Sequence, residues 1–435
     1  MSSSLIGLFG FLAAFLLMAL RLPVGISLLL VGFGGTVWLS GWQAAVFTLS
    51  GQVFEAASQY DLSIVPMFVL MGNLASAAGL SRDLYEAAHR WIGHWKGGLA
   101  SATIVGCAGF AALSGSSIAS ALTMGKVALP EMRRFGYSGK LATGTVAAGG
   151  TLGILIPPST GFVVYAILTE TSIGKLFMAG VVPGIVLAIL FIIAIRIVVA
   201  FDPSQGPPGP RSSMPDKLRA TVRALGITIM VALTIGGIYS GFFTTVEAAG
   251  VGAFFGLIMF FLRCGADWHR LAEVLADTLR TTGIVFVIII GASVFSPFIA
   301  LSKLPELVTQ SLPTQALGPL GVMLLIVLIY AVLGMFVEGL SMLVLTLPII
   351  FPVVTALGYD PIWFGVVIVI VLEMGLISPP VGVNCFVVRT IAPDVKLQTI
   401  FAGIMPFWAA MIVMILLLIA FPEIAMTLPK AMFAR

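Results

Sequence analysis

Charged side chains are scarce in this sequence: 9% of its 435 residues are Asp, Glu, Lys or Arg, whereas about a quarter is usual for a soluble domain. Hydrophobic residues make up 59%, and the mean hydropathy is +1.13. These values exclude a soluble globular domain. They predict an all-α polytopic membrane protein with room for about ten to twelve spans of roughly 20 residues. The net charge of +4 is spread over loops and does not indicate a nucleic-acid partner.

Cysteine and histidine, with three residues each, are too few and too scattered for a disulfide framework or a metal site. His89 and His94 are five residues apart, which places them on different faces of a helix. No HExxH motif is present, and the stretch from Gly115 to Ala119 lacks the final glycine of a GxSxG motif. We therefore expect neither enzymatic activity nor a cofactor.

Several residues recur at one offset of 222 positions, which indicates a duplicated unit. The pairs are Pro130 and Pro352, Tyr137 and Tyr359, Gly153 and Gly375, and Pro157 and Pro379. The predicted halves are residues 1–200 and 224–435, joined over 201–223 by a Pro/Gly/Ser-rich, basic linker that we expect in the cytoplasm. Each half should contain scaffold or arm helices, a hairpin and a broken helix. In the second half, an amphipathic helix at 267–279 is expected to precede an apolar segment at 283–302.

Each half contains a glycine followed by a Pro-Pro pair within an apolar segment, at 141–169 and at 361–390. Proline has no amide hydrogen and pushes its predecessor out of the helical conformation, so both segments are predicted to be broken helices. Broken backbone at membrane depth must be buried in protein or line a wet cavity, where its carbonyls can coordinate a cation. Paired interruptions predict the binding site of a transporter. Two kinked helices without a ligand are the alternative.

Two other apolar segments, at 98–129 and 319–352, are each interrupted by a polar tip. The arms of the first are too short to cross about 30 Å of hydrocarbon, which predicts a re-entrant hairpin. Its tip would place the hydroxyls of Ser114, Ser116 and Ser117 near the middle of the membrane. The alternative is that these serines pack against backbone in a kinked helix.

Four ionisable residues lie in apolar surroundings, where a charge is costly and usually faces a cavity or a partner. They are Lys303, Glu338, Glu373 and Arg389. Lys303 or Arg389 is expected to meet a substrate carboxylate, and Glu338 to orient polar groups of a substrate or support an ion site. The alternative is that these are interfacial charges that extend to the lipid headgroups.

The stretches GCAGFAALSGSSIASALTMGKVALPEMRRFGY and LATGTVAAGGTLGILIPPS resemble the large membrane subunit of tripartite ATP-independent periplasmic (TRAP) transporters, and the resemblance covers essentially the whole chain. It implies an inverted-repeat, elevator-type secondary transporter of the ion-transporter superfamily in the bacterial inner membrane. It also implies sodium-coupled import of a small organic anion, such as a C4-dicarboxylate or sugar acid, delivered by a soluble periplasmic binding protein. A small four-span membrane subunit is expected as a separate polypeptide.

The resemblance, carried over by motif, implies two sodium sites formed largely by carbonyl oxygens. The first is expected at Ser114, Gly153, Ile156 and Pro158. The internal repeat places the second at Gly339, Gly375, Ser378 and Pro380. The substrate is expected between the two tips, with candidate contacts at Ser116, Ser117, Pro157, Lys303, Glu338, Pro379 and Arg389. Because the second tip reads Val-Glu-Gly-Leu-Ser instead of Leu-Ser-Gly-Ser-Ser, the two sites need not share the same ligands.

The main alternative is a stand-alone ion-coupled carboxylate carrier of the same superfamily that needs no binding protein. A passive channel fits less well, because paired broken helices around a mid-membrane site are typical of alternating access. The residues identify neither the anion, nor the number of sodium ions per substrate, nor any association beyond the small subunit.

Overall fold

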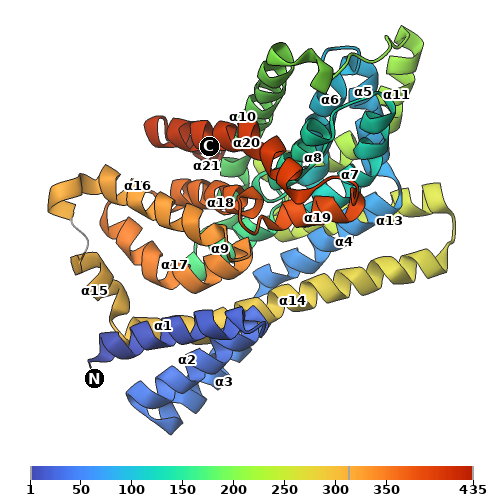
Figure 1. Cartoon of the computed structure of the whole chain (residues 1–435). Coiled ribbons are helices and arrows are strands. Elements are labelled where there is room, and N and C mark those ends of the chain that lie inside the picture. Colours follow the sequence, from blue (N-terminus) through green and yellow to red (C-terminus); the bar gives the residue numbers. More distant parts are fainter. Residues whose placement is uncertain (1, 312–313, 434–435) are drawn as a thin grey trace.

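The computed structural model describes residues 2–311 and 314–433, and within these ranges every regular element is a helix (Figure 1). Nine helical stretches in the same ranges are long and apolar enough to cross a membrane, judged by length and composition. The predicted all-α polytopic class is therefore confirmed.

The scaffold and arm helices come from the start of the chain and from its middle. They are α1 (Ser3–Ala19), α2 (Val24–Ser40), α3 (Trp42–Ser58), η1 (Tyr60–Ser63), α4 (Ile64–Ala77), α5 (Leu80–Ile92), α11 (Met214–Val231), η3 (Ala232–Gly236), α12 (Gly237–Tyr239), α13 (Thr245–Cys264), α14 (Trp268–Leu301) and α15 (Leu304–Ser311). The long helix α14 extends along one side of the molecule, with α1, α2 and α3 packed near its C-terminal part (Figure 1).

The expectation of a separate amphipathic helix at 267–279 is wrong, because these residues and the apolar segment after them form the single 34-residue helix α14. Gly283 lies inside α14 without ending it, and the helix packs against α2 and α4. Gly25 of α2 and Gly291 of α14 face each other so closely that a Cβ at Gly25 would lie 2.1 Å from the carbonyl oxygen of Val287. Such contact between small residues is a usual way for helices to associate in membranes.

The hairpins and broken helices form the other part of the molecule. The first half contributes α6 (Gly98–Ser114), α7 (Ser117–Arg134), α8 (Gly139–Leu155), α9 (Thr160–Thr169) and α10 (Ile173–Phe201), followed by the short η2 (Pro203–Gln205). The second half contributes α16 (Thr314–Gly334), α17 (Gly339–Ala356), α18 (Pro361–Ile377), α19 (Val383–Ile391), α20 (Leu397–Ala420) and α21 (Glu423–Phe433). Helices α8 and α18 are almost entirely buried and pack against each other, so they form the centre of this part.

The duplicated unit is visible helix by helix. Helices α7 and α17 begin and end at one constant offset, the same 222 positions that separate the recurring prolines, and so do α8 and α18. At that offset, Ser116 and Glu338 cap the N-termini of α7 and α17 with their side chains. Both hairpins continue past Pro130 and Pro352, because a proline inside a helix removes one hydrogen bond and can bend the helix without ending it.

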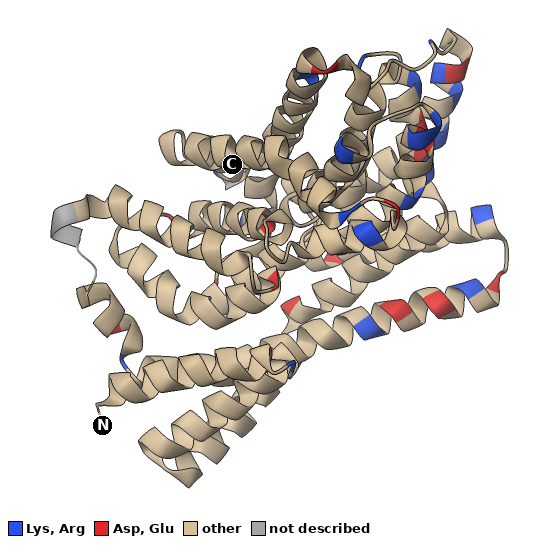
Figure 2. Ribbon diagram, in the orientation of Figure 1, with Lys and Arg blue, Asp and Glu red and all other residues tan. Residues whose placement is uncertain are grey.

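Charged residues gather at one end of the molecule, around α5, α7 and α11, and along the first turns of α14 (Figure 2). The rest of the ribbon carries few charges. An excess of Lys and Arg marks the cytoplasmic side of membrane proteins. The linker after α10 belongs to this end, and its location in the cytoplasm stays a prediction.

Candidate functional site

The tip of the first hairpin is a tight turn that carries several hydroxyl groups. Helix α6 ends at Ser114, and Gly115 takes a left-handed conformation with φ 57°. Ser116 caps α7 by accepting a hydrogen bond from the amide of Ala119 at 3.4 Å. The hydroxyl oxygens of Ser114 and Ser120 are 2.7 Å apart. The turn therefore presents hydroxyl and carbonyl oxygens. Oxygens of this kind, at unwound backbone in a membrane protein, can coordinate sodium ions.

The first broken helix lies directly against this tip. Helix α8 ends at Leu155, the Pro157–Pro158 peptide bond is cis, and α9 begins at Thr160. The amide and the hydroxyl of Thr160 both donate to the carbonyl of Gly115, at 3.3 and 2.8 Å. A Cβ at Gly115 would lie 2.9 Å from the carbonyl oxygen of Pro158. The tip and the break thus form one packed unit.

Gly153 permits a close approach between α8 and the tip. A Cβ at this position would lie 2.5 Å from the carbonyl oxygen of Ser116. The carbonyl of Gly153 lacks its usual helical donor, because the residue four positions later is Pro157, which has no N–H. The break and the tip therefore bring together the four residues predicted for the first sodium site: Ser114, Gly153, Ile156 and Pro158.

The second break has a different hydrogen-bond arrangement. The amide of Ser378 donates to the carbonyl of Gly375 at 2.9 Å, so this carbonyl has the donor that its counterpart in the first half lacks. The Ser378 hydroxyl donates to the carbonyl of Met374 at 2.6 Å and accepts from the indole nitrogen of Trp408 in α20 at 2.9 Å. At the second predicted site, more of the polar groups are therefore hydrogen-bonded within the protein.

The surroundings of the two breaks also differ. Pro157 and Pro158 are buried, whereas Pro379 and Pro380, joined by a cis peptide bond, are exposed. Hairpin 2 reaches the second break through Gly334, because a Cβ at Gly375 would lie 2.6 Å from the Cα of that residue. Gly339 begins α17 and faces Leu372 of α18, which a Cβ at Gly339 would contact at 3.6 Å. The two halves share a plan, but their sites have different surroundings.

The carboxylate of Glu338 is engaged with its own helix. It accepts hydrogen bonds from the amides of Leu340 and Ser341, at 3.1 and 2.9 Å, and from the Ser341 hydroxyl at 2.8 Å. A negative charge at a helix N-terminus is stabilised by the unpaired amides and by the helix dipole. Glu338 therefore shapes the second tip as the N-cap of α17, and its contact with a substrate stays a prediction.

A cavity of about 220 Å³ lies between the tip of hairpin 1, the start of α17 and the scaffold helices α4 and α14. Its polar lining residues are Asn73, Ser76, Ser114, Ser116, Thr123, Thr160 and Thr281. Apolar side chains such as Phe110, Ile284 and Leu340 complete the wall. Small-molecule sites usually combine apolar walls with a few polar groups, as this cavity does, although they are commonly larger, at about 300–1,000 Å³.

The other substrate candidates lie outside this cavity. Lys303, with φ 56°, forms the exposed turn between α14 and α15, and Arg389 is exposed in the last turn of α19. Ser117 instead donates a hydrogen bond to Glu373 of α18 at 3.2 Å. Pro157 and Pro379 belong to the breaks themselves. Their roles toward a substrate stay predictions, as do the sodium ligands.

The cavity includes residues that sequence reasoning missed. Asn73 donates a hydrogen bond to Thr278 of α14 at 3.0 Å and also lines the cavity. An asparagine within the apolar segment 63–80 was an available signal, because uncompensated polar groups are rare at membrane depth. Thr281 gave no such signal, since only the assembled fold brings α14 beside hairpin 1.

A protein-family model for the tripartite ATP-independent periplasmic transporter, DctM component, matches residues 11–424. The chain belongs to this family. It is 35% identical over 387 residues to the C4-dicarboxylate TRAP transporter large permease protein DctM of Pseudomonas aeruginosa, covering 89% of this chain and 90% of that protein. It is 30% identical over 410 residues to the sialic acid TRAP transporter large permease protein SiaM of Vibrio cholerae, covering 94% and 95%.

Two solved membrane transporters share the fold. The YdaH transporter of Alcanivorax borkumensis superposes with a TM-score of 0.58 at 15% identity, covering 88% of this chain and 90% of that one. MtrF of Neisseria gonorrhoeae gives a TM-score of 0.60 at 13% identity, with coverages of 90% and 85%. At these identities the likeness establishes the architecture alone.

Proposed function

We propose that this chain imports a small organic anion across the bacterial inner membrane together with sodium ions, as the large permease subunit of a TRAP transporter. The observation that carries the proposal is the contact between the first hairpin tip and the first broken helix. There, the Gly153 carbonyl, which lacks its helical donor, and the hydroxyl-bearing tip lie beside the cavity. C4-dicarboxylates and sugar acids are the first substrates to test, because relatives named for a C4-dicarboxylate and for sialic acid match most of the chain.

The two proposed sodium sites should differ in affinity. The first, at Ser114, Gly153, Ile156 and Pro158, is the stronger candidate, because the carbonyl of Gly153 has no amide donor from Pro157. The second, at Gly339, Gly375, Ser378 and Pro380, has more internal hydrogen bonds. We therefore expect sodium to bind more tightly at the first site.

The proposed transport mechanism is an elevator movement. The hairpins and broken helices would shift together along the scaffold, carrying the cavity from one side of the membrane to the other. Three features support this division: α8 and α18 pack on each other, the tip and the break are hydrogen-bonded, and the cavity lies between this unit and helices α4 and α14. A cavity between two such units opens when one slides past the other.

The proposed partners are a periplasmic binding protein that delivers the anion and a small four-span membrane subunit. A stand-alone carrier of the same architecture is the second candidate. The relatives described above favour the tripartite system, because their names assign them to TRAP transporters.

Uptake by proteoliposomes that contain this chain and its small partner subunit tests the proposal. The binding protein and an inward sodium gradient are each included or omitted, choline replaces sodium, and labelled C4-dicarboxylates and sugar acids serve as substrates. Uptake that requires both components supports the proposal. Sodium-driven uptake without the binding protein would establish the stand-alone carrier, and uptake indifferent to sodium would refute the coupling.

A further inference from the structure

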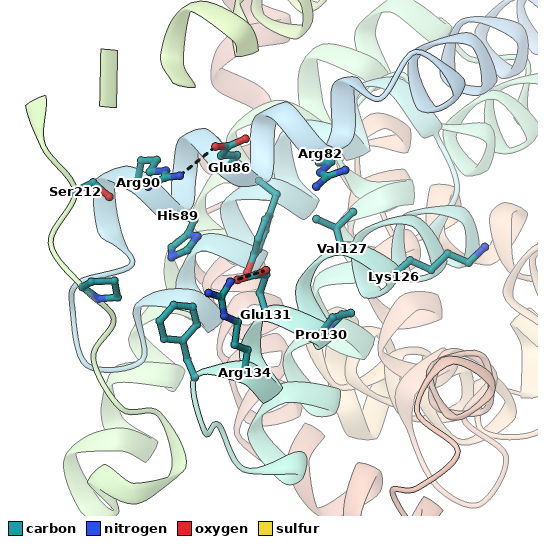
Figure 3. A pocket seen from close by; sticks show the side chains of 13 residues that line it. Arg82, Glu86, His89, Arg90, Lys126, Val127, Pro130, Glu131, Arg134 and Ser212 are labelled. Atoms are coloured by element: carbon teal, nitrogen blue, oxygen red, sulfur yellow. Dashed lines mark hydrogen bonds and ion pairs between the residues drawn. The ribbon is translucent and has the colours of Figure 1, made fainter. Parts of the chain in front are cut away.

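A second cavity, of about 650 Å³, lies between α5, α7 and the linker after α10 (Figure 3). We call it the α5–α7 cavity. The linker closes it on one side with Pro210 and Ser212. Backbone hydrogen bonds hold the linker in place, from Gly97 to the carbonyl of Gly206 at 2.8 Å and from Gly209 to the carbonyl of Gly93 at 3.0 Å. None of the residues assigned to the transport site lines this cavity.

The α5–α7 cavity has an excess of positive charge. Its lining contains four cationic side chains and two carboxylates: Arg82, Arg90, Lys126, Arg134, Glu86 and Glu131. Arg90 pairs with Glu86 at 3.4 Å, and Arg134 approaches Glu131 at 4.0 Å. Arg82 and Lys126 form no ion pair with the described residues. Two cations are therefore available to an anion that enters the cavity.

The two unpaired cations come from different helices of the cavity wall. Arg82 is on α5 and Lys126 is on α7, and both side chains are exposed. Charged hydrogen-bond donors of this kind are suited to a phosphate or carboxylate group.

The position of the α5–α7 cavity indicates where such an anion comes from. Trp91 and Trp95 follow on the same segment and are 45% and 40% exposed. Lys217 lies over the ring of Trp91 at 5.2 Å, and Arg196 lies over the ring of Trp95 at 4.6 Å. Exposed tryptophans beside cations mark the headgroup level of a membrane, and charged residues gather at this end of the molecule (Figure 2). Basic pockets at this level bind anionic lipid headgroups.

We propose that the α5–α7 cavity binds the phosphate of an anionic phospholipid headgroup, held by Arg82 and Lys126. Arg82 is on α5, outside the hairpin, whereas Lys126 is on α7, the second arm of hairpin 1. The bound headgroup connects these two helices. The site does not depend on sodium coupling or on the identity of the transported anion.

The test measures lipid binding to the purified full chain, by native mass spectrometry and by thermal unfolding in detergent. The probes are phosphatidylglycerol, phosphatidylcholine and inorganic phosphate. The variant Arg82→Gln/Lys126→Gln removes both free cations, whereas Arg211→Gln/Arg219→Gln removes two exposed charges that do not line the cavity. Arg82→Lys/Lys126→Arg keeps both charges, so it separates a loss of charge from a folding defect.

We expect phosphatidylglycerol to bind the wild type and to raise its unfolding temperature, and phosphatidylcholine to do neither. Binding should weaken about tenfold or more in Arg82→Gln/Lys126→Gln, and remain in the control and charge-keeping variants. Equal binding by the first variant and the Arg211→Gln/Arg219→Gln control would overturn the proposal. Protection by inorganic phosphate with none by phosphatidylglycerol would overturn the lipid assignment and indicate a soluble anion.

Discussion

The hydroxyl of Ser117 in the first hairpin donates a hydrogen bond to the carboxyl of Glu373 in the second broken helix, at 3.2 Å. Both residues are at least 95% buried, and the other carboxyl oxygen of Glu373 has no partner within the described residues. The contact joins the two halves of the chain 256 positions apart. It gives Glu373 a structural role beside the break that contains Gly375.

Replacing Ser117 by alanine should destabilise the protein. The change leaves the buried Glu373 carboxyl without its donor, which costs about 1–3 kcal/mol. Thermal unfolding of the purified chain should show a lower midpoint for Ser117→Ala. The variant Glu373→Gln retains an acceptor for the Ser117 hydroxyl, and it should unfold closer to the wild type than Glu373→Ala does. Equal midpoints for wild type and Ser117→Ala would contradict this role.

Alanine at Gly115 should weaken sodium activation of uptake. A residue with a Cβ pays about 1–2 kcal/mol of conformational energy in the left-handed backbone of Gly115. The new Cβ would also lie 2.9 Å from the carbonyl oxygen of Pro158. Displacing that proposed ligand should raise the sodium concentration for half-maximal uptake by about tenfold. Gly358→Ala is the matched control, because Gly358 also has a positive φ, of 83°, with open space around it. The same sodium response in both variants would argue against a site at this tip.

Removing the amide of Asn73 should weaken substrate binding. We expect Asn73→Ala to raise KM for uptake by about tenfold, the effect of losing one hydrogen bond to a charged ligand. Thr278→Val is the control, because it removes the hydrogen bond to Asn73 without changing a residue that lines the cavity. Uptake kinetics that are unchanged in Asn73→Ala would move the substrate away from this cavity.

The stability of the chain should decrease below about pH 6.5 because of His89. Burial lowers the pKa of His89 below its usual value, and the neighbouring Arg90 lowers it further, while Glu131 and Glu86 act in the opposite direction. The unfolded chain therefore takes up this proton at a higher pH than the folded chain. The stabilisation is complete above the unfolded pKa and is lost as the pH falls toward the folded one.

Thermal unfolding at about pH 7.5 and about pH 5.5 measures the effect of His89, since these values lie on either side of the usual histidine pKa. His89→Gln is neutral at both values. We expect its unfolding temperature to fall less on acidification than that of the wild type. A fall at least as large in His89→Gln would show that other groups cause the acid sensitivity.

The duplicated breaks and hairpins were predictable because they depend on local chemistry. Proline has no amide hydrogen wherever it lies, so the pairs at Pro157 and Pro379 interrupt their helices in the structure as predicted. The N-cap role of Glu338 also depends on local chemistry, because a carboxylate that precedes a helix can accept hydrogen bonds from the first free amides of that helix.

The cavity and the difference between the breaks were not predictable, because both depend on tertiary packing. Thr281 lines the cavity only because α14 remains one helix across a glycine and packs beside hairpin 1. Ser378 is held by Trp408, a residue of another helix that no motif connects to the break. Long-range contacts of this kind have no signature in a single sequence.

The most direct test of sodium coupling is the influx of labelled sodium measured together with substrate uptake in the same proteoliposomes. We expect sodium to enter in a fixed ratio to the substrate. We also expect Gly153→Ala, whose Cβ would lie 2.5 Å from the carbonyl oxygen of Ser116, to lower both fluxes together. Substrate accumulation without any sodium influx would contradict the coupling.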